Sequence, residues 1–176
     1  MSAEEELATY AVDGVAPGAI VKPQSAEEAA AVVRFASAER LALIPVGARS
    51  KCHIGMPPTR YDVAVDMSGM RQIAHYDAGD LTLSVDAGMP LRELEGALAR
   101  WRQFLPLAVP CFGSSTAAGA IASGIDSVLR QQYGTVRDFL IGAEFVDGKG
   151  KLCKSGGLVV KNVTGYDLHK DRKSVV

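Results

Sequence analysis

The sequence predicts an α+β protein in which a small parallel α/β lobe is followed by an antiparallel lobe that carries helices. Two observations lead to this class. An apolar strand, an amphipathic helix and a second apolar strand follow one another within residues 19–46, which is the order of a parallel β-α-β unit. Further along, two pairs of strand-like runs are each joined by four turn residues, at 77–80 and 147–150, which predicts two antiparallel hairpins.

In the first lobe, we expect residues 1–16 to be a polar, poorly ordered lead-in. A short strand at 19–21 comes next. Ser25 and Glu28 have the spacing of a capping box, and they begin a helix that ends near residue 40. The apolar stripe of this helix consists of Ala29, Val32, Val33, Phe35 and Ala36.

Two more strands complete this lobe, at 41–46 and 61–66. The first of them should lie parallel to the strand at 19–21, because the helix between them is long enough for a crossover connection. The second alternates apolar and polar residues, with Val63 and Val65 as the apolar ones, which predicts a third strand.

In the second lobe, the hairpin strands are expected at 72–76 with 81–85, and at 139–146 with 151–154. Pro90 suits the first turn of a helix. Its apolar residues repeat at three- and four-residue steps, at Leu91, Leu94, Leu98 and Trp101. The following stretch, 103–125, has no charged residue but several prolines and glycines, so it predicts backbone close to a large ligand rather than a membrane span.

Composition narrows the function. The 176 residues carry a net charge of −1, and Lys and Arg are scattered, so we exclude a nucleic-acid partner. The three cysteines form no CxxC pair, which predicts no metal site and is typical of a reducing, cytoplasmic compartment.

The first candidate motif, Gly47-Ala48-Arg49-Ser50-Lys51, directly follows the second strand. A loop with a glycine and a hydroxyl at the carboxyl end of a parallel strand can present backbone N–H groups to an anion, and Arg49 and Lys51 add positive charge. An ordinary turn with two solvated basic residues explains the same pattern. The loop is not a Walker A motif, and no G-x-G-x-x-G occurs in the chain, so a P-loop or Rossmann site is not expected.

The second motif extends from Pro110 to Gly124 and consists mainly of small residues. Small side chains such as Ser115, Gly119 and Ala122 would let the backbone approach a flat ring system closely. Residues Gly113 to Thr116 can open a helix whose free N–H groups meet a phosphate. The alternative is a small-residue helix packed tightly against a sheet.

Two further motifs lie downstream. The run Tyr133-Gly134-Thr135-Val136-Arg137-Asp138 predicts a turn that delivers Asp138 to the start of a strand. The last motif is Val160-Lys161-Asn162-Val163-Thr164-Gly165-Tyr166-Asp167-Leu168. None of the four motifs identifies a function alone.

In this order, however, the motifs resemble the FAD-binding PCMH-type domain of the vanillyl-alcohol-oxidase superfamily, over about residues 17–170. The run at 160–168 is most similar to the FAD-binding subunits of bacterial glycolate oxidases. The resemblance implies a PCMH-type fold and FAD as the cofactor. The FAD-binding residues that it implies are Gly47, Ala48, Arg49, Ser50, Lys51, Pro110, Gly113, Ser115, Thr116, Gly119, Ala122, Gly134, Asp138, Gly165 and Tyr166.

The sequence departs from the family pattern at two of these places. Arg49 stands where the G-x-G-S-K pattern has its second glycine, so the φ angle of this residue is a question for the structure. Ala118 replaces the first glycine of T-x-G-G, where a methyl group would crowd the cofactor. No histidine follows a G-G pair in the first loop, so we expect FAD to be bound noncovalently. We expect His53, His75 and His169 to be surface or packing residues.

The end of the chain differs from the family as well. Residues 171–176 match nothing in the family, and we expect them to be a non-native tail. In the family, the G-Y-D-L motif leads into a segment that completes the flavin site and then into a substrate domain. We therefore expect the domain at 17–170 to be incomplete, and this chain alone to be inactive.

The resemblance implies an oxidoreductase that oxidises a small 2-hydroxy acid, with glycolate to glyoxylate as the leading reaction. It also implies a sister flavin subunit and an iron–sulfur subunit as partners, which would bring the protein to the inner face of the membrane without direct insertion. Two alternatives stay open: another flavin oxidoreductase of this fold, of the D-lactate dehydrogenase or enolpyruvyl-glucosamine reductase type, and a non-catalytic scaffold subunit. No catalytic residue is assigned, because the acid and base groups are expected in the missing half or in the sister subunit.

Overall fold

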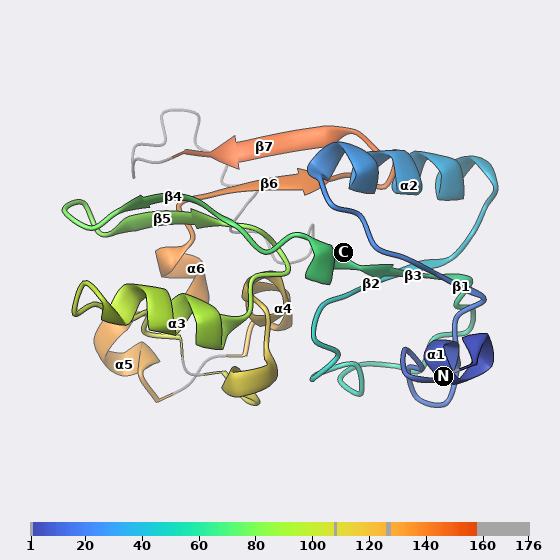
Figure 1. The fold of residues 1–176 in the computed structure, drawn as a ribbon, viewed down its shortest axis with the longest axis horizontal. Coiled ribbons are helices and arrows are strands. Elements are labelled where there is room, and N and C mark those ends of the chain that lie inside the picture. The colour runs from blue at the N-terminus through green and yellow to red at the C-terminus, as the bar shows by residue number, and fades with distance from the viewer. Residues whose placement is uncertain (1, 108, 126–127, 158–176) are drawn as a thin grey trace.

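The computed structural model describes residues 2–107, 109–125 and 128–157 of the chain. In these ranges the strands form a three-stranded parallel sheet and two separate antiparallel hairpins, with helices around them (Figure 1). The predicted α+β class is therefore confirmed, including the order of a parallel lobe before an antiparallel one.

The parallel sheet has the order β1 (Ala19–Val21), β3 (Val63–Asp66), β2 (Leu43–Val46). As predicted, β1 and β2 run in the same direction, but β3 lies between them and pairs with both. Ala64 in β3 is completely buried and Val65 is 5% exposed, so the central strand has both faces covered. The strand predicted at 61–66 is therefore present, over Val63–Asp66.

Helix α2 (Ala26–Ala38) begins as predicted, with the Ser25 side chain accepting a hydrogen bond from the Glu28 backbone N–H. It packs against the later hairpin, and Arg34 donates a 2.8 Å hydrogen bond to the Gly150 carbonyl. The alanines of the predicted stripe are buried, but Phe35 is 63% exposed. Including Phe35 in the stripe was wrong, because the helix turns that position away from the hairpin.

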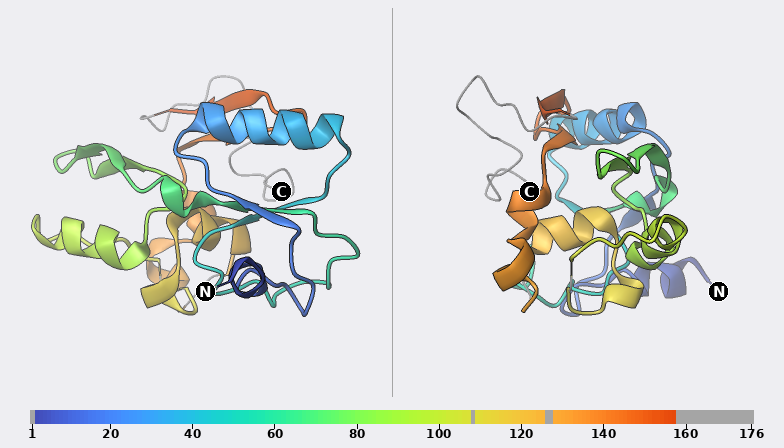
Figure 2. Two further views of the ribbon diagram at one scale, coloured as in Figure 1. Left: turned by 45° about the vertical axis from the view of Figure 1, so that its right-hand side comes forward. Right: turned by 90° about the vertical axis from the view of Figure 1, so that its left-hand side faces the viewer.

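The N-terminal segment is not the poorly ordered lead-in that we expected. Helix α1 (Ala3–Ala8) is held by a capping box between Ser2 and Glu5. Beyond it, Tyr10 and Val12 are buried in a cluster with Val46, Tyr61 and Ala64, beneath the parallel sheet. Helices α1 and α2 lie on opposite sides of that sheet (Figures 1 and 2).

Both predicted hairpins form. Strands β4 (Ile73–Asp77) and β5 (Thr82–Val85) pair antiparallel, as do β6 (Gly142–Val146) and β7 (Leu152–Gly156). In each turn an aspartate, Asp77 or Asp147, accepts backbone hydrogen bonds from residues further along, which is the mechanism that makes such sequences turn.

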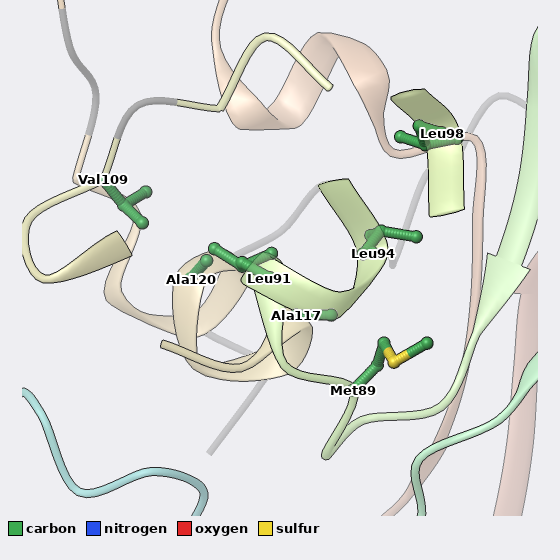
Figure 3. Close-up of a cluster of buried hydrophobic side chains, with 7 residues drawn as sticks. All are labelled: Met89, Leu91, Leu94, Leu98, Val109, Ala117 and Ala120. Carbon is green, nitrogen blue, oxygen red and sulfur yellow. The ribbon is translucent and has the colours of Figure 1, made fainter. Parts of the chain in front are cut away.

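The second core lies around α3 (Leu91–Ala99), as Figure 3 shows. Leu91, Leu94 and Leu98 are at most 3% exposed and pack with Ala117 and Ala120 of α4 (Ala117–Ser123). Trp101 was expected in the same stripe, but the helix ends before it and the side chain is 61% exposed, edge-on to Tyr76.

Short elements connect these parts. The 3₁₀ helices are η1 (Met67–Gly69) and η2 (Phe112–Ser114), and the remaining helices are α5 (Arg130–Tyr133) and α6 (Val136–Phe139). In the described part of the chain, no helix is long and apolar enough to cross a membrane.

Candidate functional site

Two of the predicted motifs meet in space. We call residues 47–51 the first loop and residues 110–116 the second loop. The Lys51 Nζ donates a 2.5 Å hydrogen bond to the Ser115 Oγ, and the Ser50 and Ser115 hydroxyl oxygens lie 3.4 Å apart. The first loop follows β2 and the second precedes α4, so residues more than 60 positions apart form one site.

Ser115 joins the two loops. Its side chain is only 1% exposed, and its hydroxyl donates to the Cys111 carbonyl at 2.9 Å while it accepts from Lys51. A serine hydroxyl has one proton to donate, so the remaining contact with Ser50 is best made with Ser50 as the donor. Ser115 therefore fixes the position of the loops and has little hydrogen-bonding capacity left for a ligand.

Gly47 and Thr116 form a second contact between the loops. Thr116 is buried and caps α4, its Oγ1 accepting from the Gly119 N–H at 3.3 Å. A Cβ atom at Gly47 would overlap the Thr116 Oγ1, so only glycine allows the backbone to come this close.

Both loops carry backbone N–H groups that donate no hydrogen bond in the described part of the chain, including Gly113 and Thr116 of the second loop. Within the ranges that the structure describes, no backbone N–H of residues 48–51 donates a hydrogen bond. The start of α4 differs, because Ala117 and Ala118 donate to the Met89 and Ala87 carbonyls at 2.8 and 3.1 Å, and the Gly119 N–H is taken by Thr116. The expectation that this helix offers free N–H groups is thus corrected for residues 117–119, whereas those of residues 48–51 remain free.

Arg49 stands where the family pattern has a glycine, and its backbone keeps the conformation of one. Its φ is +57°, the left-handed conformation that glycine would adopt without strain. For another residue this conformation costs about 1–2 kcal/mol. The guanidinium carbon lies 4.1 Å from the centre of the Tyr10 ring, and a cation–π contact at a partly exposed position contributes about 0.5–1 kcal/mol, which offsets part of the strain.

Tyr10 is anchored in turn on Asp66, at the carboxyl end of β3. The Tyr10 hydroxyl donates to the Asp66 Oδ2 at 2.7 Å, and the Ser68 N–H donates to Oδ1 at 2.9 Å. Burial opposes ionisation of Asp66, but these hydrogen bonds and the nearby Lys22 outweigh it and lower its pKa. Burial, reinforced by the hydrogen bond to Asp66, raises the pKa of Tyr10. Sequence reasoning missed both residues, although an aspartate at the end of an apolar strand is a signal for Asp66.

Tyr61 and Cys52 lie behind the first loop. The Tyr61 hydroxyl is buried without a hydrogen-bond partner in the described part of the chain, and burial raises its pKa to about 12. Burial also raises the pKa of the Cys52 thiol, against the opposing charge of Arg49. A thiol with a raised pKa is a weak nucleophile at neutral pH, so Cys52 is a packing residue here.

The third motif forms a local unit of its own. Gly134 has a φ of +90°, and the Asp138 carboxylate accepts from the Thr135 N–H at 2.7 Å and the Thr135 hydroxyl at 2.9 Å. Asp138 lies within α6 and not at the start of a strand, because its capping bonds to Thr135 begin a helix instead. That part of the prediction was wrong.

The remaining predicted positions vary in their surroundings. Ala48, Pro110, Gly113 and Ala122 are exposed, and a Cβ at Gly113 would meet the Arg92 guanidinium of α3. Arg92 is thus a basic residue beside the second loop, which sequence reasoning did not single out. Gly165, Tyr166 and the rest of the 160–168 motif lie outside the described residues, as does the stretch 171–176.

The arrangement suits a diphosphate. The first loop offers the free N–H groups of residues 48–51, and the Lys51 ammonium, with three donors, spends one on Ser115. Arg49 and Lys51 place two positive charges on the same short segment. Gly47 lets the backbone of that segment lie close to Thr116. Free backbone donors and basic side chains together are what recognise phosphate groups.

Comparison with known proteins agrees with this chemistry. The family described as "FAD binding domain" matches residues 17–156, which include both loops and the local unit at 134–138. The chain belongs to this family. Its cofactor is FAD, and the predicted PCMH-type FAD-binding fold is confirmed.

Curated relatives are similar over most of the chain. It is 36% identical to the glycolate oxidase subunit GlcE of Escherichia coli over 139 residues, which is 78% of this chain and 39% of that protein. It is 32% identical to a D-2-hydroxyglutarate dehydrogenase of Xanthomonas citri, over 86% of this chain and 32% of the relative. This FAD-binding chain thus spans about a third of the length of these relatives.

A solved structure supports the fold. An alkyldihydroxyacetonephosphate synthase superposes with a TM-score of 0.71 at 24% sequence identity, covering 85% of this chain and 29% of the synthase chain. At this identity the likeness concerns the fold alone. In the part of the chain that is described, no group of three or more His, Cys, Asp or Glu residues is placed to hold a metal ion.

Proposed function

We propose that this chain is the FAD-binding part of an oxidoreductase that oxidises a small 2-hydroxy acid, with glycolate to glyoxylate as the leading reaction. The observation that carries the proposal is the agreement among relatives. The names of the glycolate oxidase subunits, the D-2-hydroxyglutarate dehydrogenases and a D-lactate dehydrogenase of Archaeoglobus fulgidus all refer to 2-hydroxy acids. The motif at 160–168, which resembles glycolate oxidase subunits, favours glycolate among them.

In this proposal the two loops hold the diphosphate of FAD. The backbone N–H groups of 48–51 donate to the phosphate oxygens, and Lys51 and Arg49 neutralise their charge. Ser115 and Thr116 keep the loops together, so the donors are in place before the cofactor arrives. When bound, FAD supplies the chemistry by accepting a hydride from the substrate α-carbon.

The proposal includes partners and location. We propose a sister flavin subunit, in keeping with the glycolate oxidase relatives GlcE and GlcD, and an iron–sulfur subunit that takes electrons onward. We also propose that the assembly is cytoplasmic and reaches the inner face of the membrane through these partners. Because the chain spans about a third of its relatives' length, we propose that residues beyond it are needed for turnover.

The test is a substrate panel on the purified full-length protein. We expect flavin absorbance, and reduction of a dye acceptor fastest with glycolate among glycolate, D-lactate and D-2-hydroxyglutarate. A faster rate with D-2-hydroxyglutarate or D-lactate would keep the reaction class and replace the substrate. Flavin absorbance with no reduction by any of the three, in the presence of the partner subunits, would instead favour a scaffold role.

A matched pair of lysine variants tests the site. Lys51→Met should weaken FAD binding by about tenfold or more, because a charge-assisted hydrogen bond to a phosphate is worth about 1.5–3 kcal/mol. Lys149→Met removes the same charge from the exposed turn between β6 and β7 and should leave the affinity unchanged. Equal affinities of both variants, measured by flavin fluorescence titration, would show that the first loop does not hold the cofactor.

A further inference from the structure

Tyr10 occupies a position that the proposed function does not explain. Its ring lies under the Arg49 guanidinium, at 4.1 Å from the guanidinium carbon to the ring centre. Its hydroxyl donates to the buried Asp66 carboxylate at 2.7 Å. The side chain is 9% exposed and packs in the cluster that contains Val46, the last residue of β2 before the first loop.

These contacts make Tyr10 a rigid support. Asp66 is 2% exposed and is itself held by the Ser68 N–H, so the tyrosine hydroxyl is attached to a fixed point of the central strand. Arg49, by contrast, belongs to an exposed loop and has the left-handed backbone that a non-glycine residue adopts with strain. The stacked ring restrains the arginine side chain, and with it the backbone of residues 48–51.

We propose that Tyr10, from the N-terminal segment ahead of the matched domain, is a positioning residue that holds the first loop ready for the diphosphate of FAD. This inference rests on the proposed binding of FAD by residues 48–51. It assigns a role to a segment that lies outside residues 17–156, the range over which the family matches. A purely structural tyrosine would support the core without affecting the loop through Arg49.

The first test is a double-mutant cycle for FAD affinity in the full-length protein. Tyr10→Phe keeps the ring under Arg49 but removes the hydrogen bond to Asp66, and we expect its dissociation constant to lie between those of wild type and Tyr10→Leu. Tyr10→Leu removes the ring, and we expect about fivefold weaker binding, the size of a cation–π contact. In an Arg49→Gln background, where the ring has no cation to hold, Tyr10→Leu should change the affinity by less than twofold.

The second test needs no cofactor. In the apoprotein, trypsin should cut after Arg49 and Lys51 at least about fivefold faster in Tyr10→Leu than in wild type, and Tyr10→Phe should be cut at an intermediate rate. Cutting after Lys149, in the distant β6–β7 turn, serves as the internal standard for global unfolding. If Tyr10→Leu does not fold, Arg49→Gln tests the same contact by removing the cation. We then expect trypsin to cut after Lys51 faster in Arg49→Gln than in wild type.

The outcomes separate the two proposals. Selective cutting in the first loop together with a coupled loss of affinity supports the positioning role. An equal effect of Tyr10→Leu in both backgrounds, or cutting that rises equally at Lys149, overturns it. Flat titrations for every protein, including wild type, would refute FAD binding at residues 48–51, and the trypsin comparison would still decide whether Tyr10 orders the loop.

Discussion

Gly47→Ala is the sharpest test of how the two loops fit together. An added methyl group at this position would overlap the Thr116 Oγ1 and lie close to its Cγ2. Thr116 is buried and caps α4, so it cannot move aside freely. Overpacking costs about 1–3 kcal/mol, and a disturbed cap adds about 1 kcal/mol. We expect the free energy of unfolding to fall by about 2–4 kcal/mol.

The assay is urea unfolding of the apoprotein followed by circular dichroism, with two comparisons. Gly96→Ala is the matched control, because no atom lies within 4 Å of the added Cβ and the residue is inside α3; it should stabilise by about 1 kcal/mol. Thr116→Ala removes the two atoms that the new methyl meets first, leaving the Thr116 Cβ at 3.3 Å. Alone it should cost about 1 kcal/mol, the value of the cap.

The double variant Gly47→Ala/Thr116→Ala tests the contact between the two residues directly. Once Thr116 is alanine, Gly47→Ala should cost little more, so the pair should lose about 1–1.5 kcal/mol and not the sum of the two single losses. Additive losses would show that the close approach of Gly47 and Thr116 does not exist in solution. A Gly47→Ala effect with the same sign as Gly96→Ala would refute the overlap directly.

Four further outcomes are expected. Acid precipitation of the full-length holoprotein should release all the flavin into the supernatant, and colour kept in the pellet would mean a covalent link. Arg49→Glu should weaken FAD binding more than tenfold, because it reverses a charge at the proposed diphosphate site; fluorescence titration with unchanged affinity would make Arg49 a solvated loop residue. The lowered pKa of Asp66 means that its stabilisation is complete above about pH 5 and is lost as pH falls through the folded-state pKa, so urea unfolding of wild type and Asp66→Asn should converge toward low pH. Tyr61→Phe should keep or raise the free energy of unfolding, by up to about 1 kcal/mol, because it removes a buried hydroxyl with no partner among the described residues, and a loss above that size would reveal a missed hydrogen bond.

Local features could be predicted from the sequence because neighbouring residues cause them. Asp77 and Asp147 bend their own hairpins through hydrogen bonds to the next few residues, and Ser25 caps α2 three residues away. The leucine spacing of α3 likewise identified its buried face. The first loop was located from the strand before it. The stripes failed only at Phe35 and Trp101, where packing partners, and not periodicity, decide which side is covered.

The tertiary structure decided how these pieces form a site. The insertion of β3 between β1 and β2 brings Asp66 beside the end of β2, and the buried N-terminal segment brings Tyr10 beneath Arg49. The contact of Lys51 with Ser115 depends on the packing of α3 against α4. Helix α3 lies between these two residues in the chain, and α4 directly follows Ser115. The hydrogen bond from Tyr10 to Asp66 joins residues 56 positions apart, and the one from Lys51 to Ser115 joins residues 64 positions apart. Their partners are chosen by shape and hydrogen-bonding capacity in the folded chain, and no periodicity or short motif records that choice.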